Sequence, residues 1–270
     1  MKKTAFGIAC GLILFLFIFP IFWIYLTSFK GRPDIYNVDA SKLFIFSMTT
    51  ENYPFVFAER DFLSDIINTA IVSVSSTILV MAISLPAAYS FARFNTGGGQ
   101  ILFTTISTRM FPVAVAAIPF FLFYRALSAL DTLWGLTLLY MYFNVSFATF
   151  LLYGFFREIP PELEHAAMTD GYGRIAILRR VIFPLIKPGA AITTVFCLIF
   201  AWNEFLFSFL FSRNLARTIS VGLSLYWSAL DVQWGAMAAA AGMAILPTLV
   251  ASWLMQRYII RGLTFGAVKG

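Results

Sequence analysis

The amino-acid sequence predicts an all-α membrane protein with six transmembrane helices, and three observations support this fold class. Hydrophobic residues make up 60% of the 270 residues and charged residues only 12%, whereas about 25% of a soluble domain is charged. Phenylalanine alone contributes 31 residues, and a soluble domain of this length could not bury so large a total apolar surface. Six stretches also reach the ~20 apolar residues that a helix needs to cross the hydrocarbon of a membrane.

These six stretches are the predicted helices in chain order. The first follows Lys2 and Lys3, as a secretory signal would, but its apolar run exceeds the roughly 7–15 residues of a signal core and no small-residue cleavage site follows it. We therefore expect an uncleaved first helix. The run Gly97-Gly98-Gly99 predicts a tight turn between the second and third helices. The stretches are 5–27, 66–92, 101–124, 133–156, 190–211 and 235–256.

Basic residues predict that both termini lie in the cytoplasm. Lys and Arg favour the cytoplasmic loops of membrane proteins, and this orientation places 11 of them inside and seven outside. Orientation thus explains the formal charge of +6, and nucleic-acid binding is disfavoured because it needs a clustered basic face. The inner segments are 1–4, 93–100, 157–189 and 257–270, and the outer segments are 28–65, 125–132 and 212–234.

The sequence lacks the motifs that enzymes require. Without a Gly-Lys dipeptide, the chain cannot form the phosphate-binding loop of ATPases. The G-x-G-x-x-A pattern at Gly171 follows a charged helical stretch instead of a strand, so we reject a dinucleotide site. His165 is the single histidine, and Cys10 and Cys197 lie in predicted spans as expected for buried hydrophobic residues. We predict no catalytic residue and no metal site, which disfavours a membrane-embedded enzyme.

The inner loop 157–189 has more features than a connector needs. Pro160-Pro161 and the acidic Glu162 and Glu164 favour the start of a helix, and Gly171 favours its end in a left-handed cap. These signals predict a helix over 161–170. Leu163, Ala166 and Ala167 would give this helix an apolar face that another surface could approach closely.

A second short helix should follow in the same loop. The segment 173–183 is basic, with Arg174, Arg179 and Arg180, and should end at Pro184, before Pro188-Gly189 breaks the chain. The alternative for the whole loop is a solvated segment that lies on the membrane surface.

The loop also carries a family motif. The loop contains the segment Glu164-His165-Ala166-Ala167-Met168-Thr169-Asp170-Gly171, followed by Val181-Ile182-Phe183-Pro184. Together these segments resemble the E-A-A-x-x-x-G loop of the membrane subunits of ABC importers. Further segments resemble the carbohydrate branch of that family, the maltose and glycerol-phosphate type permeases, and the resemblance covers essentially the whole chain. They are Arg109-Met110-Phe111-Pro112, Trp202-Asn203-Glu204-Phe205 and the tail from Gly262 to Gly270.

The resemblance implies a type I ABC importer permease fold in a bacterial-type inner membrane. It implies three protein partners besides membrane lipid: a second homologous permease subunit, a cytoplasmic ATPase dimer and an extracytoplasmic solute-binding protein. ATP and Mg²⁺ would bind to the ATPase subunits, and this chain would bind no cofactor. The implied parts are a first helix with its outer loop (1–65), a transmembrane core (66–256) and a cytoplasmic tail (257–270).

The resemblance also assigns roles to segments. The helix 161–171 would be a coupling helix seated in a cleft of an ATPase subunit, the tail would reach between the two ATPase subunits, and the outer loop 212–234 would enter the sugar cleft of the binding protein. The alternative for the tail is disorder. The implied coupling residues are Glu164, His165, Ala166, Ala167, Asp170, Gly171 and Arg174.

One departure from the motif concerns charge. His165 stands where the family motif usually has its Glu, so it cannot supply an anion to the ATPase. Glu164 could do so, although it lies about 100° around the helix from that position. The alternative is that His165 is an exposed residue without a coupling role.

Polar residues within the predicted spans are candidates for the translocation pathway. Arg109 and Glu204 would each cost roughly 2.5–3.5 kcal/mol at membrane depth, so they should face the bundle interior or a wet cavity. Amides, hydroxyls and aromatic rings suit a polyhydroxylated solute. The alternative is that Asn144 and Asn203 tie helices together, or that Arg109 and Glu204 pair with each other. The candidates are Arg109, Tyr140, Asn144, Trp202, Asn203 and Glu204.

The sequence therefore predicts a permease subunit of an ATP-driven importer for a sugar or sugar derivative. It would form half of the pathway and couple it to the ATPase through the helix 161–171. The alternative is an ion-driven secondary transporter that uses Glu204 as a carrier. The sequence does not indicate which sugar is carried.

Overall fold

The structure is a computed structural model that describes all residues except 1, 38, 59–60, 111, 228–230 and 268–270. The chain forms two compact units, Met1–Ile67 with Thr218–Thr248 and Asn68–Arg217 with Leu249–Gly270. Within the described residues the regular structure is helical, and strand pairing is confined to isolated bridges such as Lys30 with Met48. The predicted division of the chain at 65 and 256 concerns membrane topology and stays a prediction.

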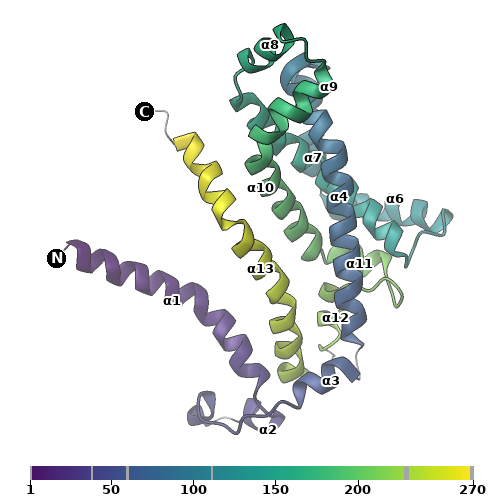
Figure 1. Cartoon of the computed structure of the whole chain (residues 1–270). Helices are drawn as coiled ribbons and strands as arrows, with labels where there is room; N and C mark the ends of the chain where they lie inside the picture. The colour runs from purple at the N-terminus through teal and green to yellow at the C-terminus, as the bar shows by residue number, and fades with distance from the viewer. Residues whose placement is uncertain (1, 38, 59–60, 111, 228–230, 268–270) are drawn as a thin grey trace. The chain divides into compact units, whose positions relative to one another are not determined.

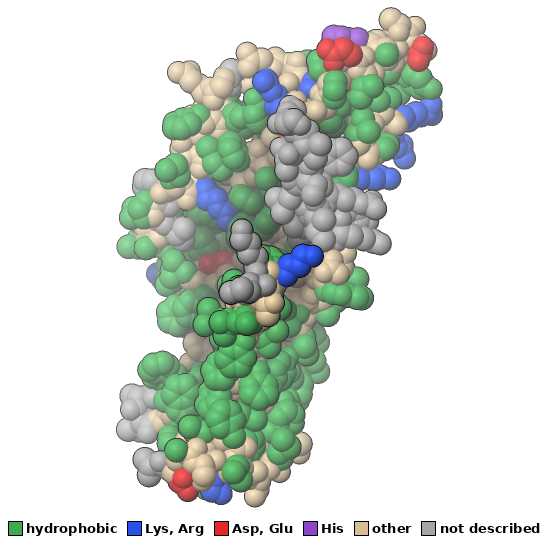
Figure 2. All heavy atoms as spheres, turned by 90° about the vertical axis from the view of Figure 1, so that its left-hand side faces the viewer, with side chains coloured by type: hydrophobic (Ala, Val, Ile, Leu, Met, Phe, Trp, Pro, Cys, Tyr) green, Lys and Arg blue, Asp and Glu red, His purple; other side chains and the backbone are tan. Residues whose placement is uncertain are grey.

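The first unit is built on α1 (Lys2–Ser28) and the beginning of α13 (Trp234–Ala267). The side chains of α1 are apolar and largely exposed, as expected for a helix that contacts lipid, and hydrophobic side chains cover much of the face in Figure 2. The Tyr25 hydroxyl donates to the Gly242 carbonyl at 2.8 Å and ties α1 to α13. The unit also contains α2 (Arg32–Ile35), η1 (Ala40–Leu43), α3 (Asn52–Ala58) and α12 (Ile219–Ser224).

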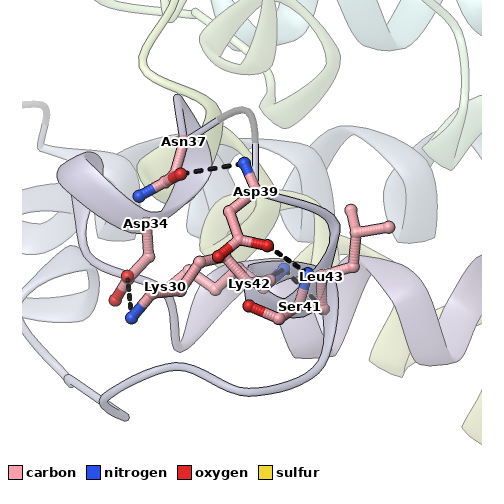
Figure 3. Close-up of polar contacts among 7 residues, drawn as sticks. All are labelled: Lys30, Asp34, Asn37, Asp39, Ser41, Lys42 and Leu43. Carbon is pink, nitrogen blue, oxygen red and sulfur yellow. Dashed lines mark hydrogen bonds and ion pairs between the residues drawn. The ribbon is translucent and has the colours of Figure 1, made fainter.

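The segment between α1 and α3 is ordered by its own polar groups (Figure 3). Asp39 caps η1 by accepting from the Ser41 N–H at 2.9 Å, and Lys42 pairs with Asp34 at 3.4 Å. The buried Lys30 ammonium donates to the carbonyls of Lys42 and Leu43 at 3.2 and 2.7 Å. These bonds satisfy a charge that would otherwise be costly to bury.

The second unit packs long helices around α7 (Leu133–Glu158), which runs beside α10 (Phe183–Trp202). One apolar cluster includes Leu136, Leu139 and Phe207, and another includes Leu152 and Ile182. The remaining helices are α4 (Phe62–Phe94), which begins in the first unit, α5 (Gly98–Ser107), η2 (Thr108–Met110), α6 (Val113–Ala126), α8 (Glu162–Thr169), α9 (Arg174–Ile177), the π-helical turn η3 (Leu178–Ile182) and α11 (Leu206–Phe211) (Figure 1).

Among the residues that the structure describes, five helices are long and apolar enough to cross a membrane, and a sixth candidate is bent. The sixth is the pair Gly99–Met110 and Ala114–Ala126, whose axes differ by 91°. The stretch predicted over 101–124 is therefore helical, but it is bent and does not form one continuous helix. Pro112, which has no N–H to donate, stands at the break. The five continuous candidates are Lys3–Ser28, Phe62–Phe94, Leu133–Glu158, Arg174–Trp202 and Trp234–Gln256.

The fifth predicted span, 190–211, also differs from the structure. The helical path runs from Arg174 through η3 to Trp202, so the predicted stop at Pro184 and break at Pro188 are wrong. Pro184 lies in the first turn of α10, directly after the π-helical turn, where a missing N–H costs little. The helix ends at Trp202 instead, and Leu206–Phe211 forms the separate α11.

Candidate functional site

The predicted helix of the loop 157–189 is present as α8. Pro161 is its N-cap, and Asp170 its C-cap. Gly171 follows with a φ of 83°, and its N–H donates to the Met168 carbonyl at 3.0 Å while the Tyr172 N–H donates to the Ala167 carbonyl at 3.1 Å. This pair of bonds is the Schellman motif, which requires a left-handed residue and so favours glycine. The end of α8 is thus determined by Gly171, as the sequence predicted.

One face of α8 is turned into the protein. Glu164 and Ala167 are the buried residues of the helix. The Glu164 carboxylate accepts a hydrogen bond from the Tyr89 hydroxyl at 2.8 Å and forms a buried ion pair with Nε of Arg93. Arg93 also donates from Nη2 to the Ile159 carbonyl at 2.8 Å. The loop is therefore folded onto the helix ends, which argues against a solvated segment on the membrane surface.

The opposite face of α8 is exposed. Glu162, His165, Ala166 and Thr169 repeat at positions i, i+3, i+4 and i+7, so they share one side of the helix. We call these four residues the outer face. Glu164 lies on the other side, which counts against our expectation that it supplies an anion to an ATPase subunit. Ala167 is likewise not part of the exposed apolar face that the sequence suggested, because it packs inward.

The remaining predicted coupling residues flank α8. Asp170 is exposed at the C-cap. The Arg174 guanidinium lies 4.7 Å from the centre of the Phe94 ring and so joins the start of α9 to the end of α4. The structure thus brings the predicted coupling residues together at one end of the second unit.

Arg109 lies in η2, at the bend between α5 and α6. Its guanidinium is 4.9 Å from the Phe147 ring centre and 4.7 Å from that of Phe200. Its Nη1 is buried and has no hydrogen-bond partner among the residues that the structure describes. Phe111, its neighbour in the motif, lies outside the described residues. The two aromatic faces offset part of the cost of burying this charge.

Glu204 lies in the interruption between α10 and α11, and its carboxylate is not paired with Arg109. It accepts hydrogen bonds from the N–H groups of Phe207 at 3.1 Å and Ser208 at 3.2 Å, and so caps the start of α11. Tyr140 lies close enough to interact with the same carboxylate. This geometry gives Glu204 a structural task at the start of α11, which differs from the pairing with Arg109 that the sequence had left open as the alternative.

The other pathway candidates surround this interruption or lie within α7. The Asn203 amide donates to the Ile199 carbonyl at 2.8 Å, which satisfies the end of α10. Trp202 and Asn144 are buried. Arg109 and Glu204 belong to two different interruptions of the helices.

Sequence reasoning missed four polar residues that organise the second unit. Tyr89 and Arg93 look like ordinary residues at the end of a span, and only their distant partner Glu164 reveals their role. Asp131 accepts from four consecutive backbone N–H groups, those of residues 213–216, at 2.8–3.2 Å. The Asn68 amide donates to the carbonyls of Leu215 and Arg217 at 3.0 Å each. No local pattern marks such long-range bonds.

The described residues contain no group of three or more His, Cys, Asp or Glu side chains placed to hold a metal ion. A family model described as "Binding-protein-dependent transport system inner membrane component" matches residues 80–264. This region includes α8, both interruptions and most of α13.

Individual relatives match over nearly the full length. The chain is 34% identical to the sulfoquinovosyl glycerol transport system permease protein SmoH of Agrobacterium fabrum, over 97% of this chain and 93% of the relative. It is 32% identical to the trehalose transport system permease protein SugB of Mycobacterium tuberculosis, over 100% of this chain and 98% of the relative. A solved structure of a bacterial ABC transporter involved in the import of alginate has a chain of similar fold, with a TM-score of 0.78 at 23% identity over 96% of this chain and 98% of that chain.

Proposed function

The chain belongs to the family of binding-protein-dependent transport system inner membrane components, and from this membership we propose that it is a permease subunit of an ATP-driven importer for a sugar or sugar derivative. It is a multi-pass inner membrane protein and a transport subunit, not an enzyme. It would form half of the translocation pathway. The sugar class is supported by the names of its relatives, which include transporters of sulfoquinovosyl glycerol and trehalose.

The exposed outer face of α8 carries the proposal. This short helix is attached to α4 on one side by the ion pair of Glu164 with Arg93. On the other side it presents the four exposed residues of the outer face. Such a surface suits a cleft in a partner protein. We infer that closure of the ATPase dimer moves α8, and that the attached helices then rock between inward and outward openings.

The position of Glu164 changes the expected contacts. Because Glu164 is buried, the carboxylates that remain exposed near the outer face are those of Glu162 and Asp170. A cationic group of the ATPase would have to meet one of these. His165 contributes an exposed imidazole ring to the same face.

The partners implied by the family complete the transporter. They are a second permease subunit, an ATPase dimer and an extracytoplasmic solute-binding protein. ATP and Mg²⁺ would act on the ATPase, since this sequence lacks the phosphate-binding loop. The expected insertion of the tail between the ATPase subunits stays a proposal. The structure continues α13 to Ala267, while the side chains of 257–267 and all of 268–270 lie outside what it describes.

For the pathway, Arg109 remains the stronger candidate. Its buried Nη1 has no partner within the described residues, so this N–H is available to a solute, a water molecule or a neighbouring subunit. The polar groups of Asn203 and Glu204 are already used by the ends of α10 and α11.

The proposal is tested by isolating the tagged chain from its own membranes in mild detergent and identifying the retained proteins by mass spectrometry. We expect a second permease and an ATPase. Ala166→Trp, which places a bulky ring on the outer face, should release the ATPase and retain the second permease. Ala126→Trp is the control, because Ala126 is an exposed alanine at the end of α6. Recovery of the chain alone, with solute uptake intact after reconstitution, would refute the proposal.

A further inference from the structure

We propose that Arg93 and Glu164 form a buried charge pair that fixes α8 to the end of α4, so that a force on α8 moves α4 instead of bending the loop between α7 and α10. The inference rests on the proposed function and assigns a positioning role to two residues that would not touch ATP, solute or the ATPase. We call the group of Tyr89, Arg93 and Glu164 the latch.

The latch joins α8 to α4 by an ion pair and a side-chain hydrogen bond. Of the two buried residues of α8, Ala167 contributes only a methyl group, whereas Glu164 accepts from both Tyr89 and Arg93. The side chains of Arg93 and Glu164 are 9% and 5% exposed. The helix is only eight residues long, so a single firm attachment can determine how it moves.

Arg93 joins three elements at one point. It lies in the last turn of α4, pairs with Glu164 on α8, and donates from Nη2 to the Ile159 carbonyl at the end of α7. A guanidinium can make these bonds simultaneously because its donors are fixed in one plane. Lysine offers a point charge and could not reproduce this arrangement.

Tyr89 supports the pair from the preceding turn of α4. Its ring packs edge-on against Phe156 at 5.6 Å and Phe94 at 5.8 Å, and its hydroxyl reaches Glu164. Phe94 in turn lies under the Arg174 guanidinium at the start of α9. The contacts therefore connect both ends of the α8–α9 segment to the last turns of α4.

Burial makes the pair sensitive to the loss of either member. If one member is neutralised, the charge of the other stays buried without its partner, which is costly. If the two residues are exchanged, a carboxylate and a guanidinium again face each other. The charge-reversal double variant consequently distinguishes a specific ion pair from a general requirement for the native side chains.

The experiment uses the assembled transporter with its binding protein and compares Glu164→Gln, Arg93→Gln and the double variant Arg93→Glu/Glu164→Arg. Retention of the ATPase, basal ATP hydrolysis and stimulation of hydrolysis by the loaded binding protein are measured. We expect the single variants to retain the ATPase and basal hydrolysis while stimulation falls at least fivefold. The double variant should recover at least part of the stimulation.

Glu158→Gln is the matched control. Glu158 is an exposed carboxylate at the end of α7, so its variant should behave as the unmodified transporter. Normal stimulation in both single variants would overturn the proposal. An ATPase that is absent even from the unmodified preparation would refute the proposed function itself, so the two failures are distinguishable.

A second measurement leaves the latch residues unchanged. Spin labels at Thr96, just after α4, and Met168, an exposed residue of α8 that is not part of the outer face, report the separation of α4 and α8 by pulsed electron resonance. We expect the same distance in nucleotide-free and ATP-bound transporter, because the latch holds throughout the cycle. A distance that changes when ATP binds would show that α8 moves independently, and would overturn the proposal.

Discussion

Asp131 accepts hydrogen bonds from four consecutive backbone N–H groups of the segment 213–216. Burial by itself would raise the pKa of this carboxyl, but the four N–H groups outweigh it and hold the pKa below its ordinary value. Asp131 also adopts a positive φ of 55°, which aspartate tolerates better than most residues. One side chain therefore determines the shape of a loop that is more than 80 residues away in the sequence.

We expect Asp131→Asn to lower the stability of the purified transporter at neutral pH by about 1–3 kcal/mol, because an amide leaves some of the N–H groups unpaired. Because the pKa of Asp131 is lowered in the folded state, its ionised carboxylate stabilises the fold at pH values above the unfolded-state pKa of about 3.9. This stabilisation is lost as the pH falls through the folded-state pKa. The difference between variant and unmodified protein should therefore shrink below about pH 4 in thermal unfolding curves.

Asp61→Asn is the control for that measurement. Asp61 also has a positive φ, of 50°, but within the described part of the chain its side chain accepts a single hydrogen bond, from the exposed Ser64 hydroxyl. Its variant should unfold as the unmodified protein does. Equal losses in the two variants would mean that the backbone conformation, and not the four hydrogen bonds, explains the effect.

Gly171 is the second residue whose conformation matters. Its φ of 83° strains any side chain by roughly 1–2 kcal/mol, and more for a β-branched one, although nothing lies within 4 Å of an added Cβ. Gly171→Val should therefore abolish stimulation of ATP hydrolysis by the loaded binding protein while leaving membrane insertion intact. Gly173→Val is the control, because an added Cβ at Gly173 also has no atom within 4 Å but the backbone there has an ordinary φ of −72°. This variant should retain stimulation. Retained stimulation in Gly171→Val would contradict the importance of the cap.

At the scale of elements, the interruption between α10 and α11 depends on Glu204. Its carboxylate caps α11, so Glu204→Ala should lower stability by about 0.5–2 kcal/mol, the usual loss for a cap, and Glu204→Gln by less. Thermal unfolding of the purified transporter measures both. If Glu204 were a proton carrier, Glu204→Gln would instead abolish uptake in a stable transporter supplied with ATP.

Some elements followed from local signals and others did not. The end of α8 could be predicted because Gly171 acts on its own turn, and the spans near 5–27, 66–92, 133–156 and 235–256 because apolar length is a local property. The side of α8 that is buried could not, because Glu164 pairs with Arg93, which lies 71 residues earlier. Pro184 misled the prediction because a π-helical turn precedes it.

At the scale of the whole molecule, the motifs indicated the family more reliably than the pathway. The E-A-A-type loop is a continuous segment, and the match over residues 80–264 confirms the family it indicated. The pathway candidates are scattered over α7, η2 and the end of α10, and the polar groups of two of them, Asn203 and Glu204, satisfy helix ends. If the pathway is shared with a second subunit, as we propose, it cannot be deduced from the residues of one.

The central claim is that ATP hydrolysis by a partner, transmitted through α8, drives import. The most direct measurement is solute uptake into vesicles that contain the purified transporter and its binding protein, with ATP supplied and all ion gradients collapsed by ionophores. We predict that uptake continues and requires ATP. Loss of uptake with ATP still present would contradict the claim and favour an ion-driven transporter.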